Sequence, residues 1–172
     1  MEKIPFQTVQ DSIDKICGIT EESELEKASE HLFDVQPDLA NFFMEFIEDM
    51  SEGAQDLGFM MALILNHAFE NKYKSLRPMT EDEVVNRFES AEAEFEKYLT
   101  INDDMIANLQ EQEAKSGQPE ILNYMLEELF MSPELEPTLE QNEQVHLFII
   151  CKFFVDCLNE LVKETSSEIT RH

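Results

Sequence analysis

The chain has 172 residues, of which 38 are acidic and 12 basic, for a formal net charge of −26. A surface this negative repels nucleic-acid phosphates and anionic membranes, which argues against direct binding to either. Apolar residues make up 42% of the chain and include 13 Phe, enough to build a sizeable core. Glycine is rare (4 residues) and no stretch alternates apolar with polar residues, so we expect an all-α fold of about eight helices.

Cysteine usage and the absence of apolar runs indicate a compartment. Cys17, Cys151 and Cys157 are odd in number and form no Cys-x-x-Cys pair, which is typical of free thiols in a reducing environment. No apolar run reaches the length of a signal peptide or a membrane span. The expected localisation is therefore cytoplasmic.

Four helices are predicted in the first 80 residues. The first ends at Gly18, and Thr20 is the expected N-cap of the second. Pro37 opens the third helix at the position where a missing N–H is harmless. The fourth begins after Gly53 and is apolar on more than one side, which favours a central place. The expected ranges are 8–17, 20–35, 37–50 and 53–74.

Four more helices are predicted after the break at Pro78. Thr80 and Glu83 form a capping box, Asn102 caps the next helix, and Pro119 opens the one that runs to Phe130. The last helix is expected from about 137 to 163. Its apolar residues cover about half of its circumference, so it should form the centre of the core. Lys152 and Asp156 fall on its polar stripe, where they can pair weakly.

A shift of 82 residues superimposes the third and seventh predicted helices. QPDLANFFMEFIE at 36–48 then matches QPEILNYMLEELF at 118–130 at four identical positions. The apolar phase of the preceding helices and the caps Thr20 and Asn102 also fall in register. We therefore predict that a four-helix unit is duplicated, with halves 1–80 and 81–172 sharing one core in a single domain, 1–172.

Catalytic motifs are sparse. The chain has no glycine-rich phosphate loop and no nucleophile elbow. The best metal-like pattern is Glu143-x-x-His146, which has the ligand spacing of di-metal bundles, while His67-x-x-Glu70 and His31-x-x-Asp34 show the reverse spacing. So many acidic residues produce such spacings by chance. We therefore expect no metal and no cofactor, and keep Glu143, His146, His67 and Glu70 as weak metal candidates.

The distribution of basic residues is more informative. No Lys or Arg occurs between Lys27 and Lys72, where nine acidic residues lie, or between Lys115 and Lys152, where seven lie. Both windows cover the third helix of a predicted half. The candidate partner-binding residues are Glu45, Glu48, Asp49, Glu52, Glu127, Glu128, Glu134 and Glu136.

These observations favour a non-catalytic interaction or adaptor protein whose acidic surfaces bind a basic protein partner. Two alternatives remain. A DNA-mimic inhibitor would show rows of carboxylates at phosphate-like spacing. A metal-dependent helical-bundle enzyme would show carboxylates and His67 or His146 converging inward. The sequence leaves the oligomeric state open.

Overall fold

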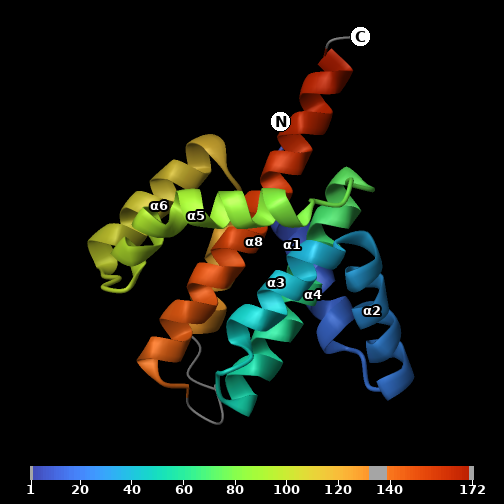
Figure 1. The fold of residues 1–172 in the computed structure, drawn as a ribbon, viewed down its shortest axis with the longest axis horizontal. Helices are drawn as coiled ribbons and strands as arrows, with labels where there is room; N and C mark the ends of the chain where they lie inside the picture. The colour runs from blue at the N-terminus through green and yellow to red at the C-terminus, as the bar shows by residue number, and fades with distance from the viewer. Residues whose placement is uncertain (1, 132–138, 171–172) are drawn as a thin grey trace.

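Helices make up the regular secondary structure of the computed structural model, which describes residues 2–131 and 139–170 (Figure 1). Within these residues there are eight α-helices, a short π-helical turn η1 and no strand, which confirms the all-α prediction. No helix in this described part is both long and apolar enough to cross a membrane. The elements are α1 (Phe6–Cys17), α2 (Glu22–Val35), α3 (Pro37–Ile47), α4 (Glu52–Tyr73), α5 (Glu81–Tyr98), α6 (Asp103–Ser116), α7 (Pro119–Leu126), η1 (Glu127–Met131) and α8 (Gln141–Thr170).

Local capping signals fix most helix starts where the sequence predicts them. Thr80 accepts from the Glu83 N–H while the Glu83 carboxylate accepts from the Thr80 N–H, so the capping box is confirmed. Asn102 caps α6, and a proline opens both α3 and α7. The predicted cap Thr20 is wrong. Glu21 occupies the N-cap of α2 without a side-chain hydrogen bond, and the charge of the first helical turn is complemented by its glutamates instead.

The core is centred on α4 and α8, which pack against each other while α1 covers α4 (Figure 1). Gly58 on α4 allows this close approach, because a Cβ there would lie 2.9 Å from a methyl carbon of Leu147 on α8. Aromatic rings join the two predicted halves: Phe42 on α3 and Phe88 on α5 have ring centroids 5.0 Å apart, and each ring also meets Phe153 on α8. One hydrophobic cluster therefore runs through both halves.

Two later elements differ from the prediction. α7 ends at Leu126 and continues as the wider π-turn η1, which brings Leu129 into the core. The predicted start of the last helix, near Pro137, lies outside the described residues. In the structure α8 begins at Gln141 and extends past Lys163 to Thr170.

Two buried glutamines make similar contacts. Gln36 and Gln118 each precede a helix-opening proline, and both are almost inaccessible to solvent. The Gln36 side-chain oxygen accepts from the Met79 N–H at 3.0 Å, just before α5, and that of Gln118 accepts from the Ile4 N–H at 2.8 Å, just before α1. The Gln118 contact joins the two predicted halves, whereas the Gln36 contact lies within the first. Descent of the halves from one duplicated unit stays a prediction, because α5 has 18 residues and α1 has 12.

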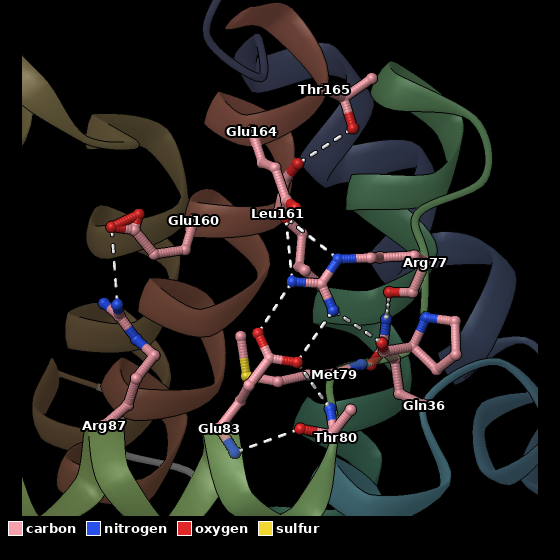
Figure 2. A network of polar contacts seen from close by, with 11 residues as sticks. Gln36, Arg77, Met79, Thr80, Glu83, Arg87, Glu160, Leu161, Glu164 and Thr165 are labelled. Carbon is pink, nitrogen blue, oxygen red and sulfur yellow. Dashed lines mark hydrogen bonds and ion pairs between the residues drawn. The ribbon is translucent and has the colours of Figure 1, made fainter. Parts of the chain in front are cut away.

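Arg77 anchors the connection between the halves (Figure 2). Its guanidinium donates two hydrogen bonds to the Glu83 carboxylate of α5, at 2.9 and 2.8 Å, and a third to Glu164 of α8 at 3.0 Å. The Arg77 carbonyl also accepts from the Gln36 side chain at 2.9 Å. The guanidinium holds the pKa of Glu83 down to about 2, so this bidentate pair persists at neutral pH.

Candidate functional site

A cleft of about 600 Å³ opens between α1, α2 and α4 in the first half of the chain. Residues 14–19, one side of α2 and one side of α4 line it. The volume lies within the range of sites that bind small ligands or the side chains of a partner. Its lining residues are Asp14, Lys15, Ile16, Gly18, Ile19, Glu24, Lys27, Ala28, His31, Leu32, Leu63, Asn66, His67 and Glu70.

α2 leaves this cleft open because little of its own surface is apolar enough to pack. Across the described helix α2, Leu32 alone is fully buried, and Leu25 remains 41% exposed. The helix carries five carboxylates and one lysine, Lys27. In Figure 1 it lies on the outer flank of the molecule, away from the α4–α8 centre. A helix with so narrow an apolar stripe is held along one edge and leaves the other edge free.

The bottom of the cleft is apolar. Leu63 of α4, Leu32 of α2 and Ile16 of α1 are buried side chains that line it, and the partly buried Ala28 and Ile19 extend the apolar surface toward the opening. Such a surface gains free energy when an apolar side chain of a ligand covers it and releases its water.

A carboxylate is held in place at the polar end of the cleft. The His31 Nε2 lies 2.9 and 2.8 Å from the two oxygens of Glu70, and the Asn66 amide donates to the same carboxylate at 2.6 Å. The Glu70 side chain is still 31% exposed, so solvent reaches part of it. Glu70 is therefore an oriented anion that can accept another hydrogen bond from a cationic group.

His67 lines the same cleft, and its ring is hydrogen-bonded to neighbouring residues. Its Nδ1 is 2.8 Å from the Ser12 hydroxyl and 3.4 Å from the amide nitrogen of Asn71. Since an amide nitrogen only donates, Nδ1 is the acceptor and the ring proton is on Nε2. Burial lowers the pKa of His67, so the ring is neutral at pH 7. Ser12 is completely buried, so its hydroxyl orients the ring and is not presented to a substrate.

The four weak metal candidates do not converge. Glu143 accepts from the N–H and hydroxyl of Ser51 at the start of α4, and His146 bonds the Asn142 carbonyl at 2.7 Å. His67 and Glu70 do line one cleft, but Ser12 and His31 are their partners. Among the described residues no three His, Cys, Asp or Glu side chains come together as a metal site.

The candidate acidic residues fall into separate settings. Glu45, Glu48, Asp49 and Glu52 are exposed around the corner between α3 and α4. Glu127 is exposed in η1, whereas Glu128 is half-buried beside α1, and burial raises its pKa. Glu134 and Glu136 lie outside the described residues. The structure thus gives the two basic-free windows different surroundings.

Comparisons with protein-family models, curated proteins and solved structures find no match to this chain. The cleft is therefore defined by its geometry alone. Sequence reasoning missed its α2 wall, because His31 pairs with Glu70 across the fold and not with Asp34 on its own helix. The spacing Glu24, Ala28, His31 along one side of α2 was the available signal, and it is common in solvated helices.

Proposed function

We propose that this chain is a non-catalytic interaction protein that binds a basic, amphipathic segment of a protein partner in the α1–α2–α4 cleft. The observation that carries the proposal is the combination of an apolar bottom with an oriented, partly exposed carboxylate, Glu70, at one end. An amphipathic helix places its apolar side into such a groove and its charged residues at the edges.

Charge supports a basic occupant. Six acidic residues of 21–34 are exposed on the outer surface around α2 (Glu21, Glu22, Glu24, Glu26, Glu30 and Asp34). Lys15 and Lys27 stand at the rim among these carboxylates and leave the region strongly negative. A basic segment is attracted from a distance, about 10 Å at 0.1 M salt, before its apolar residues make contact. The exposed residues Glu45, Glu48, Asp49 and Glu52 add to this long-range field.

The polar groups of the cleft are arranged for binding. Ser12 is enclosed, His67 is neutral and hydrogen-bonded, and the Glu70 carboxylate already has two donors. These groups hold fixed hydrogen-bonding positions at a hydrophobic surface, as in sites that select a ligand by shape and charge.

A defined peptide tests the proposal. The probe is a fluorescent lysine–leucine peptide, about four helical turns long, with leucines at i, i+3, i+4 and i+7. A scrambled peptide of equal composition is its control. We expect the amphipathic peptide to bind more tightly, with shifts of the Leu32 and Leu63 methyl resonances on binding. Equal binding of both peptides, or methyl shifts elsewhere only, would contradict the proposal.

Two charge reversals on α2 provide the matched comparison. Glu24 lines the cleft, whereas Glu26 is exposed on the same helix and is not part of the lining. We expect Glu24→Lys to weaken peptide binding about tenfold at low salt and Glu26→Lys to weaken it far less. If the two variants lose affinity equally, the attraction is a property of net charge and the cleft is not the site.

A DNA-mimic function would appear instead as competition between this chain and duplex DNA for a DNA-binding protein.

A further inference from the structure

A second groove lies in the other half of the chain, between α5 and α6, with a volume of about 490 Å³. The buried side chains of Tyr98 and Leu109 and the partly buried Met105 form its apolar part. The polar lining consists of Ser90, Glu94 and Lys97 of α5 and Asn108 and Gln112 of α6. The groove continues past Glu94 into a hollow of about 330 Å³ that reaches Phe153 of α8.

The same feature of the fold produces this groove and the first cleft. α6, like α2, has 14 residues and buries few of them: within the described helix these are Leu109 and Glu113. Each helix is the second of its half and stands away from the rest of the molecule, α2 on one flank and α6 on the opposite flank (Figure 1). Each therefore leaves a groove between itself and its neighbours, with a largely buried apolar lining.

Two exposed side-chain amides in the groove can bind a peptide. The side-chain amides of Asn108 and Gln112 line it one helical turn apart and form no hydrogen bond with the described part of the chain. An amide side chain offers both a donor and an acceptor, which matches the backbone groups of an incoming segment. Tyr98 donates to Glu94 at 2.8 Å, and both residues line the groove.

Charge again selects a basic occupant. α5 carries seven carboxylates and two cations, and α6 carries four carboxylates and one cation. The Glu92 and Glu96 side chains of α5 and the Asp103 and Asp104 side chains of α6 are exposed on the same two helices outside the lining, which itself holds Glu94 and Lys97. A segment with apolar side chains flanked by lysine or arginine complements this surface.

We infer that the α5–α6 groove is a second docking site for a basic, amphipathic protein segment, so that the chain holds two such segments on opposite flanks. The inference rests on the proposed function and extends it: with two sites, the chain can hold two basic segments at the same time. Two sites on one rigid body raise the effective concentration of the second segment once the first is bound. A partner with two basic segments, or two copies of a partner, would be held together in this way.

The test is the stoichiometry of the same lysine–leucine peptide, measured by calorimetry on the full chain. We expect two peptides per chain, with methyl resonances of Met105 and Leu109 shifting together with those of Leu32 and Leu63. Ala93 is exposed and lines the groove, so Ala93→Trp should fill it and leave one site. Ala107→Trp, at an exposed position of α6 that does not line the groove, is the matched control and should keep two.

The outcomes separate this inference from the proposed function. One peptide per chain, with shifts at Leu32 and Leu63 alone and no effect of Ala93→Trp, would overturn the second site and leave the first intact. Binding at Met105 and Leu109 alone would support the second site and contradict the first. Circular dichroism of each variant establishes that lost binding is not lost folding. If Ala93→Trp fails to fold, Asn108→Ala with Gln112→Ala, which removes both amides from an exposed wall, should weaken the second site at least fivefold.

Discussion

α2 and α6 lie on opposite flanks of the molecule, and different interactions hold them to it (Figure 1). α2 is attached by the buried Leu32 and by the His31–Glu70 contact, in which the histidine side chain is 55% exposed. α6 is attached by Leu109 and by a buried ion pair, in which the Lys152 ammonium of α8 lies 3.0 Å from the Glu113 carboxylate. The two side chains are only 8% and 11% exposed.

The ion pair belongs to a larger buried network. Lys152 also donates to Asp156 at 2.7 Å, and Glu113 accepts from the Gln118 N–H at 2.7 Å. Burial by itself lowers the pKa of Lys152, but the two carboxylates raise it above its ordinary value, so the ammonium stays charged. Gly117 makes room for this arrangement, since a Cβ there would lie 1.8 Å from a Glu113 oxygen. The comparison teaches that two flanking helices, each with one buried leucine, can depend on different polar contacts: a largely exposed His–Glu contact for α2 and mutually compensating buried charges for α6.

Removing one partner of the buried pair should have the largest effect. Lys152→Met leaves the Glu113 carboxylate buried without a counter-ion, and we expect a loss of about 3–5 kcal/mol in the free energy of unfolding. Lys115→Met, which removes the exposed i,i+4 pair with Glu111, should change it by less than about 1 kcal/mol. Urea denaturation of both variants measures the difference. Similar losses in the two variants would show that the Lys152 network behaves as a surface pair.

The two buried glutamines, Gln36 and Gln118, are expected to give the next largest effects on stability. Gln118 binds the Ile4 N–H, the Tyr73 hydroxyl and the Asn159 amide oxygen, whereas Gln36 binds only the Met79 N–H and the Arg77 carbonyl. Replacing either with Ala leaves buried polar groups unsatisfied, at about 1–3 kcal/mol per group. We therefore expect Gln118→Ala to be the more destabilising, as measured by urea midpoints. A larger effect for Gln36→Ala would mean that the contacts around Arg77 contribute more to the stability of the connection between the predicted halves than those of Gln118.

The carboxylates at the α3–α4 corner and in η1, of which Glu128 is half-buried, should have a small and opposite effect. Changing Glu45, Glu48, Glu127 and Glu128 to Gln reduces mutual repulsion and should stabilise the protein by less than about 1 kcal/mol. Because these residues lie outside both grooves, the variant should associate with the lysine–leucine peptide more slowly and with a weaker salt dependence, while its dissociation rate is nearly unchanged. Stopped-flow measurements separate the two rates. Faster dissociation would show that these carboxylates contact the peptide directly.

The smallest expected effect is the pH dependence of stability that comes from His67 in the α1–α2–α4 cleft. The pKa of His67 is lower in the folded state than the unfolded value of about 6.5, so the folded state binds fewer protons. The associated stability is fully present above about pH 6.5 and is lost as the pH falls below that value. His67→Gln should therefore show a smaller decrease in urea midpoint between neutral and mildly acidic pH than the unchanged chain. Equal decreases would place the titrating group elsewhere.

The sequence by itself determined the features that depend on neighbouring residues. The capping box at Thr80, the Asn102 cap and the prolines that open α3 and α7 act within one helical turn, so their signals are local. The apolar residues of α8 likewise predicted a helix packed on several sides, because periodicity along one helix reports which of its sides is buried.

Only the tertiary structure decided the features that join distant segments. Lys152 was expected on the polar stripe of the last helix and is instead buried. Glu113 of α6, which is distant in sequence, supplies its counter-ion. The two grooves exist because α2 and α6 stand off from their neighbours, and the distance between two helices is not encoded in the periodicity of either. His31 and Glu70 meet for the same reason, and their contact places a fixed carboxylate at the end of the first cleft.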